Sequence, residues 1–125
     1  MAEMATDAPE RRIRVCASSE LAERGLGVRF AVDYAGREQQ AFVVRFHGHV
    51  HAYLNSCAHI PIELDYQPGD FFDLSQNYLV CATHGAYYAP QTGLCLGGPC
   101  PGRHLTKLTV IEEDDQVFYY PARNE

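Results

Sequence analysis

The residues that say most about the fold lie at positions 55–84, which read NSCAHIPIELDYQPGDFFDLSQNYLVCATH. Two short clusters in this stretch each combine a cysteine with a histidine. They are Cys57-Ala58-His59 and Cys81-Ala82-Thr83-His84, with 21 residues between His59 and Cys81. Each cluster follows a run that predicts a strand, so each lies on a loop at a strand's end. Thiolates and imidazoles are metal ligands, and the order therefore predicts a metal site between two facing loops.

The way in which cysteine and histidine are paired indicates the kind of metal site. A zinc finger usually groups like with like, two cysteines on one knuckle and two histidines on a helix. Here each loop offers one of each, and the Cys-x-His spacing is tighter than the usual zinc-finger spacing. A binuclear site suits this pairing, because both cysteines can reach one metal and both histidines the other. A mononuclear zinc site with the same four ligands is the alternative interpretation.

The rest of the chain predicts short strands. Apolar, β-branched and aromatic runs predict them at residues 13–16, 28–33, 42–46, 49–54, 78–82, 87–89, 106–111 and 116–120. His47-Gly48 is a two-residue hairpin signal, and residues 112–115 form an acidic turn between the last two strands. Residues 19–24 allow at most one helical turn, because Gly25 and Gly27 end it. Short strands at gaps of about 8 to 12 residues predict an all-β antiparallel sandwich or barrel.

Composition and charge define the class of protein. The 125 residues are 46% hydrophobic and 21% charged, which is typical of one globular domain. We expect a frayed segment at residues 1–10 and one domain at 11–125, with the metal-binding segment at about 55–104. The net charge of −6 argues against a nucleic-acid-binding surface.

Cysteine usage and the lack of long apolar runs predict the compartment. No signal-peptide pattern and no run of 18 apolar residues is found, so we expect a cytoplasmic protein without a membrane span. Thiols stay reduced there, and five cysteines, an odd number, then fit metal binding better than a disulfide framework.

The motif C-x-H followed by C-x-x-H resembles the Rieske 2Fe–2S signature, in which two histidines replace two cysteines on one iron. Several other segments are similar to the same family. They are the hairpin at residues 46–55, the aromatic run at 84–88, the turn Thr92-Gly93, the proline loop Gly97-Gly98-Pro99 and the return strand at 105–110. The similarity covers about residues 28–119. It implies a Rieske-like antiparallel β-sandwich or barrel and one 2Fe–2S cluster with the ligands Cys57, His59, Cys81 and His84.

The resemblance also implies a function. It is similar to soluble Rieske-type ferredoxins, the electron-carrying components of oxygenase systems, and such a protein is not itself an enzyme. Cys57 and Cys81 would hold the inner iron, and His59 and His84 the outer one. The surface expected to exclude water and dock a partner comprises Ile60, Pro61, Gly85, Ala86 and residues 97–101. We expect a monomer whose redox partner, a reductase or an oxygenase, offers a basic face to the charge of −6.

Residues around the cluster predict a low reduction potential for a Rieske centre. Family members of high potential have an extra cysteine in each ligand loop, joined as a disulfide, and a serine bonded to a bridging sulfide. Ile62, Thr83 and Ala86 stand at those positions, whereas Tyr88 matches a tyrosine that donates to a cysteine sulfur. Rieske potentials span about −150 to +300 mV, and fewer donors favour the lower end. The residues expected to surround the cluster without ligating it are Ile60, Ala86, Tyr88 and Pro99.

The remaining features have plainer interpretations. His47, His49 and His51 alternate along one strand, yet no carboxylate is near them in sequence, which favours a solvated hairpin over a metal site. Cys16, Cys95 and Cys100 are expected to be buried thiols, although Cys95 and Cys100 flank the proline loop and would pair under oxidation.

Further predictions concern the long loop and the alternative functions. The gap of 21 residues makes residues 61–76 an excursion near the cluster, and Phe71, Phe72 and Tyr87 are expected to pack the core or shield the cluster. One alternative function is a component or fragment of a Rieske oxygenase, although no iron-binding triad follows His104 and the chain is short for that domain. The other is a zinc-stabilised interaction module.

Overall fold

The computed structural model describes residues 11–58, 60–99 and 102–123. Its elements are ten strands and two 3-10 helices: β1 (Ile13–Ala17), η2 (Ser18–Glu20), β2 (Val28–Tyr34), β3 (Arg37–Phe46), β4 (His49–Leu54), β5 (Leu79–Val80), β6 (Tyr87–Tyr88), β7 (Cys95–Gly97), β8 (Lys107–Leu108), β9 (Val110–Glu113), β10 (Gln116–Tyr119) and η3 (Pro121–Arg123). Three antiparallel sheets have the orders β1-β10-β9, β2-β3-β4-β8 and β5-β6-β7. This confirms the predicted all-β antiparallel architecture. None of the helices in the described part of the chain is long and apolar enough to cross a membrane.

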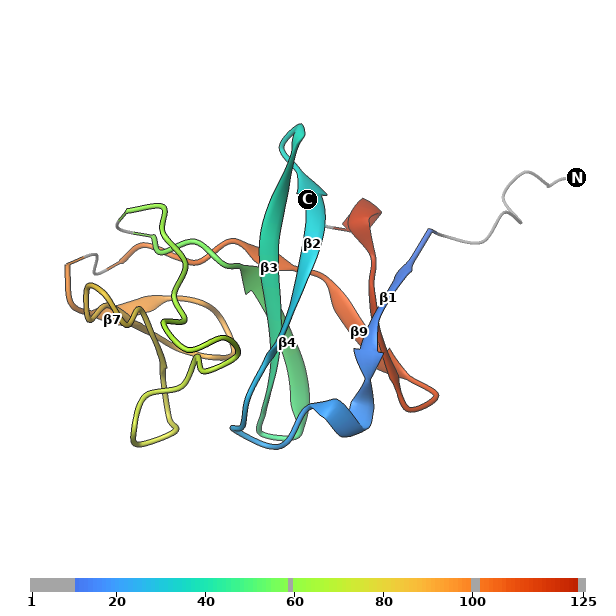
Figure 1. Ribbon diagram of the computed structural model, residues 1–125, viewed down its shortest axis with the longest axis horizontal. Coiled ribbons are helices and arrows are strands. Elements are labelled where there is room, and N and C mark those ends of the chain that lie inside the picture. Colours follow the sequence, from blue (N-terminus) through green and yellow to red (C-terminus); the bar gives the residue numbers. More distant parts are fainter. Residues whose placement is uncertain (1–10, 59, 100–101, 124–125) are drawn as a thin grey trace, which may run out of the picture.

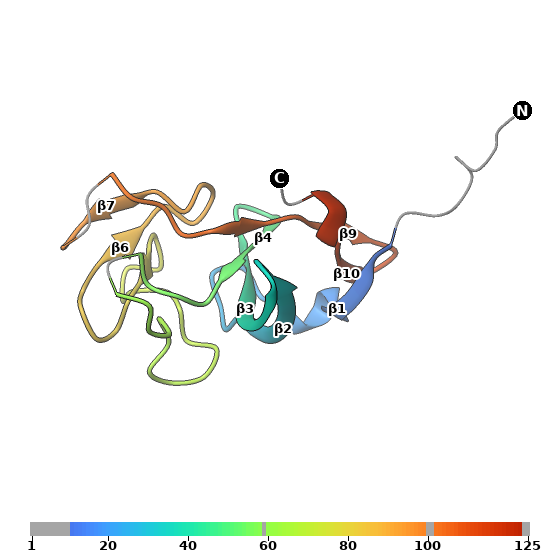
Figure 2. The same ribbon diagram turned by 90° about the horizontal axis from the view of Figure 1, so that it is seen from above.

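The molecule has two ends of different character (Figure 1). The first two sheets form one end, which we call the strand lobe. The small sheet β5-β6-β7 and the long loops of residues 55–104 form the other end, which we call the loop lobe. The turned view shows the same separation, with β6 and β7 on one side and β1 to β4, β9 and β10 on the other (Figure 2). The predicted metal-binding segment therefore folds at one end of the molecule.

The β3–β4 hairpin lies between the two lobes and packs against both. Side chains of a strand point alternately to its two faces. Phe42, Val44 and Phe46 accordingly pack into the hydrophobic cluster of the loop lobe, whereas Ala41 and Val43 pack into the cluster of the strand lobe. One hairpin thus serves both cores and links them rigidly.

The turn of this hairpin has the predicted two-residue form. His47 and Gly48 both have positive φ angles, of 54° and 79°, as the tight turn favoured by a twisted hairpin requires. The carboxylate of Glu23 accepts hydrogen bonds from both of their amides, at 2.6 and 2.8 Å. Backbone hydrogen bonds lower the pKa of Glu23, with that from Gly48 the strongest cause.

Three predicted boundaries were wrong. β3 begins at Arg37 rather than at residue 42, because a turn at Ala35-Gly36 lets residues 37–43 pair with all of β2. The predicted strand at 106–111 is two strands, since Lys107–Leu108 pairs with β4 and Val110–Glu113 pairs with β10. The acidic turn is shorter than predicted, with only residues 114 and 115 at positive φ.

The loop lobe has an aromatic core. Phe71 is fully buried and stacks on Phe42 with 3.9 Å between ring centroids, and Phe72 is 9% exposed. Both therefore pack the core as predicted. Tyr87 does not belong to this core, because it is 38% exposed and contacts Tyr78 edge to face at 5.4 Å.

Candidate metal centre

Each predicted ligand loop is closed by backbone hydrogen bonds. The first loop follows β4, and the Cys57 amide donates to the Ile62 carbonyl at 2.8 Å. The second follows β5, and the Cys81 amide donates to the Ala86 carbonyl at 2.8 Å. Gly85 turns this second loop at a φ of +75°, a conformation that favours glycine. Local sequence therefore shapes both loops, one at the end of each strand.

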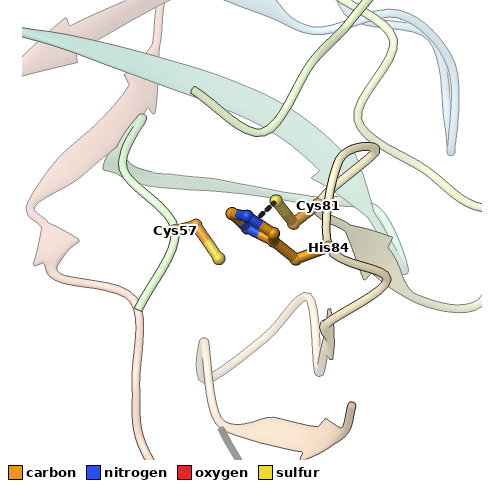
Figure 3. Close-up of side chains that lie close together, drawn as sticks. All are labelled: Cys57, Cys81 and His84. Carbon is orange, nitrogen blue, oxygen red and sulfur yellow. Dashed lines mark hydrogen bonds between the residues drawn. The ribbon is translucent and has the colours of Figure 1, made fainter. Parts of the chain in front are cut away.

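The two loops bring three of the four predicted ligands together (Figure 3). The Sγ atoms of Cys57 and Cys81 and a ring nitrogen of His84 all lie within 4.8 Å of one another. Cys81 Sγ is 3.8 Å from His84 Nδ1. Both cysteines are buried, and His84 is half-buried. The fourth predicted ligand, His59, lies outside the described residues.

The Cys81 thiol is buried beside the thiol of Cys57. Burial raises the pKa of its thiol, and the neighbouring Cys57 raises it further, whereas backbone hydrogen bonds from His84 and Thr83 lower it. Two thiolates at this place need a compensating positive charge, since burying an unpaired anion is costly. A metal supplies that charge and deprotonates its thiol ligands. The donor set therefore fits a metal centre.

Tyr88 lies against the first ligand loop. Its Oη is 3.3 Å from Cys57 Sγ and accepts a hydrogen bond from the Ala58 amide at 3.1 Å. A phenol oxygen that accepts one hydrogen bond keeps its own hydrogen as a donor, and the Cys57 sulfur is an acceptor within reach of it. The side chain is fully buried, so water does not compete for this contact. Tyr88 is thus placed to donate to the sulfur of a thiolate.

The other residues expected around the site differ in exposure. Ile60 and Pro99 are exposed. Ala86 is fully buried, so it contributes packing rather than exposed docking surface. The proline loop lies directly on it, because a Cβ added to Gly98 would come within 2.7 Å of Ala86 Cα.

The remaining cysteines do not join the candidate centre in the described part of the chain. Cys16 and Cys95 are buried, as predicted. Burial raises the pKa of Cys16 to about 11. The Cys95 thiol donates to the Gly97 carbonyl at 3.2 Å. Cys100 lies outside the described residues, and its pairing with Cys95 stays a prediction.

The three histidines of the β3–β4 hairpin are not alike. His47 and His49 are exposed, in agreement with a solvated hairpin. His51 is half-buried, and burial lowers its pKa. Among the described residues, the group that can hold a metal includes none of the three.

Sequence reasoning missed polar residues near the loops. Arg103 is exposed and donates from Nη1 to the Ala58 carbonyl at 3.3 Å. Asn55 and Asp65 are buried and bonded to each other. Single polar residues in a loop carry no periodic signal, and the contact between Arg103 and Ala58 spans 45 positions. The asparagine two positions before Cys57 was the one available clue.

Comparison with known proteins supplies the family. The family described as Rieske [2Fe-2S] domain matches residues 11–119. The chain belongs to this family. A 2Fe–2S cluster is accordingly its cofactor. The predicted family, fold class and cofactor are thereby confirmed.

Solved structures share the fold of this Rieske domain. The ferredoxin of carbazole 1,9a-dioxygenase from Nocardioides aromaticivorans IC177 is 24% identical, with a TM-score of 0.67 over 88% of this chain and 97% of its own. A chain in the complex of reduced oxygenase and oxidized ferredoxin in carbazole 1,9a-dioxygenase is 20% identical, with a TM-score of 0.67 over 90% of this chain and 95% of its own.

The fold also occurs within a larger protein. The terminal oxygenase of carbazole 1,9a-dioxygenase from Novosphingobium sp. KA1 is 24% identical, with a TM-score of 0.70 over 90% of this chain but only 30% of its own. A comparison with curated protein sequences gives no match.

Proposed function

We propose that this chain is a one-electron carrier of the Rieske ferredoxin type. Cys57 and Cys81 hold one iron of the cluster, and His59 and His84 hold the other. The observation that carries the proposal is the meeting of two buried thiols and one imidazole within 4.8 Å at the ends of two facing loops. The match over nearly the whole length of a ferredoxin supports a carrier rather than a catalyst.

The burial of the proposed ligands supports a direction for electron transfer. When bound, the cluster takes up and releases one electron, and its two neutral imidazoles favour uptake relative to an all-thiolate centre. Cys57 and Cys81 are buried, whereas His84 is half-buried. The imidazole side is therefore the exit towards a partner. Tyr88 stabilises the Cys57 thiolate. Ile62 and Thr83 cannot form the disulfide of high-potential members, and Ala86 has no hydroxyl to donate to a bridging sulfide.

The proposed docking face surrounds this exit. It comprises Ile60, Pro61 and Gly85 with the proline loop, and Arg103 stands beside it. Oxygenases and reductases are the partner classes we propose, because oxygenase and ferredoxin chains of the same fold occur together in one complex. We also propose a cytoplasmic, monomeric protein.

Electron transfer to a basic partner should depend on salt. The net charge of −6 attracts such a partner, and the attraction is screened as the Debye length falls from about 30 Å at 0.01 M to about 10 Å at 0.1 M salt. Stopped-flow oxidation of the reduced protein by a purified basic oxygenase or reductase should therefore slow with rising salt. Rates independent of ionic strength would contradict a basic partner.

One experiment tests the carrier proposal directly. The protein is purified without oxygen, its iron and acid-labile sulfide are assayed, and the dithionite-reduced form is examined by EPR. We expect two irons and two sulfides per chain and a Rieske EPR signal. The variants Cys57→Ala and His84→Ala should lose both. Cys16→Ala is the matched control, because it removes a buried free thiol from the strand lobe. Bound zinc, or iron without sulfide, would overturn the proposal.

A second candidate is the electron-accepting part of a Rieske oxygenase. The observation in its favour is the TM-score of 0.70 to a terminal oxygenase of which this chain covers 30%. The mass of the protein in its native cells separates the two candidates. A carrier of this length has 14.0 kDa, whereas an oxygenase is several times larger.

A further inference from the structure

We propose that Asn55 and Asp65 form a buried polar clamp that sets the spacing of the two ligand loops. This inference rests on the proposed function, because spacing matters only if Cys57 and Cys81 bind the same iron. We assign them as positioning residues, because among the described residues their side chains bind each other and backbone amides rather than Cys57, Cys81 or His84.

The clamp closes the base of the first ligand loop. Asn55 lies directly after β4, two positions before Cys57, and is 5% exposed. Its Nδ2 donates to Asp65 Oδ1 at 2.9 Å, and its Oδ1 accepts the Leu64 amide at 2.8 Å. The Asn55 side chain therefore joins the start of the segment that contains Cys57 to its end at Leu64 and Asp65.

The second ligand loop is hydrogen-bonded to Leu64 as well. The Leu64 carbonyl accepts the Ala82 amide at 3.0 Å, and Ala82 follows Cys81 directly. The backbone of Leu64 is thus held on one side by the first loop and on the other by the second. A displacement of Leu64 moves the two cysteines relative to each other.

Asp65 anchors this arrangement to the strand lobe. Its side chain is fully buried, and Oδ2 accepts the Gly69 amide at 2.9 Å. Arg29 of β2 lies 3.6 Å away, from Nε to the same Oδ2, and Arg29 Nη2 pairs with Glu63 at 2.6 Å. The guanidinium compensates the buried carboxylate. This ion pair joins the segment after the first ligand loop to β2 of the strand lobe.

Exchanging the side chains of Asn55 and Asp65 tests whether their hydrogen bonds set the spacing of the loops. Asn55→Asp places two carboxylates face to face, with no donor between them. Asp65→Asn places two amide groups together, and one hydrogen bond of the pattern is lost in either orientation. The double variant Asn55→Asp/Asp65→Asn restores the three hydrogen bonds, because the new carboxylate accepts from the Leu64 amide and from the new side-chain amide, whose oxygen accepts from the Gly69 amide. The negative charge moves from position 65 to position 55, so the ion pair of Arg29 with Asp65 is not among the restored contacts. Net charge is also restored.

The measurements use the full chain, purified without oxygen with its cluster. We expect each single variant to lose iron to a chelator about tenfold faster and to show shifted EPR g values, because partners that orient ligands commonly affect metal affinity by that factor or more. The double variant should return towards the wild type in both. Glu112→Gln is the control, because it breaks a partly buried ion pair in the strand lobe.

The outcomes are separable. Single variants that lose thermal stability like the control but keep wild-type g values and iron-loss rates would overturn the clamp and leave the proposed function intact. If the single variants do not fold, the double variant provides the test. A double variant that does not fold, or that folds without the wild-type EPR signal, would overturn the clamp. A wild-type chain without a Rieske signal would overturn the proposed function itself.

Discussion

At the residue scale, the buried hydroxyl of Tyr88 is expected to affect the reduction potential of the metal centre. Its Oη accepts the Ala58 amide and lies 3.3 Å from Cys57 Sγ. Reduction adds negative charge to the cluster and its sulfurs, so a donor to sulfur is worth more in the reduced state than in the oxidised one. Such a donor raises the reduction potential.

Tyr88→Phe should therefore lower the midpoint potential. If the hydrogen bond gains about 1 kcal/mol on reduction, a one-electron couple shifts by about 40 mV. Voltammetry or an EPR-monitored redox titration measures this shift.

Tyr53→Phe is the matched control for this variant. Tyr53 is also fully buried, but its hydroxyl donates to the Pro90 carbonyl at 2.6 Å and not to a sulfur. It should leave the potential unchanged. Equal shifts in the two variants, or no shift in Tyr88→Phe, would contradict this role of Tyr88.

At the element scale, the Arg45–Glu112 ion pair joins the first two sheets. Arg45 of β3 makes two hydrogen bonds to the carboxylate of Glu112 on β9, at 2.9 and 2.6 Å. Arg45 also donates to the Leu21 carbonyl at 2.8 Å. Hydrogen bonds from Arg45 are the largest cause that lowers the pKa of Glu112 to about 2. The folded state therefore favours the carboxylate.

Glu112→Gln should lower the free energy of unfolding by about 1 to 2 kcal/mol at neutral pH, because a charged hydrogen-bond pair is lost. The pKa of Glu112 lies below its ordinary value of 4.5, so its contribution is complete above pH 4.5. It is lost as pH falls towards about 2. Urea denaturation of both proteins should thus show a difference at pH 7 that shrinks below pH 4.5.

Glu113→Gln provides the comparison. Glu113 pairs with Arg12 at 3.0 Å, but both side chains are largely exposed, and such surface pairs contribute little. We expect no clear change in stability. A Glu112→Gln difference that stays constant from pH 7 to pH 2.5 would disagree with the ion-pair explanation.

At the scale of the whole molecule, the two lobes depend on the metal to different degrees. The strand lobe has strands of up to ten residues and its own hydrophobic cluster. The loop lobe has strands of two or three residues. Both ligand loops lie in it, so ligand bonds to one cluster link segments that are far apart in sequence. We therefore expect the folded structure of the loop lobe to depend on the bound cluster more than that of the strand lobe does.

Removal of the cluster by a chelator should therefore loosen one lobe. Hydrogen exchange followed by mass spectrometry should show faster exchange at the amides of Cys57, Cys81 and Ala82, which close the loops. Amides of the β2–β3 pair should stay protected. Equal loss of protection in both lobes would show that the chain unfolds as one cooperative unit.

Most of the candidate site was predictable from the sequence because its information is local. The tight motifs around Cys57 and Cys81 identify the loops, and His47-Gly48 identifies the hairpin turn. The polar first half of β3 and the strand β7 were not predictable in this way. Their residues have weak strand preference, and pairing with neighbouring strands makes them extended.

The sequence by itself determined the family and the antiparallel β architecture and predicted the donor atoms of the candidate centre, since spacing and alternation are properties of the chain alone. Only the tertiary structure decided which distant groups meet. Asn55 with Asp65, Tyr88 with Cys57 and Arg45 with Glu112 are 10, 31 and 67 positions apart. Such contacts form when packed strands and loops bring side chains together, and no local pattern encodes them.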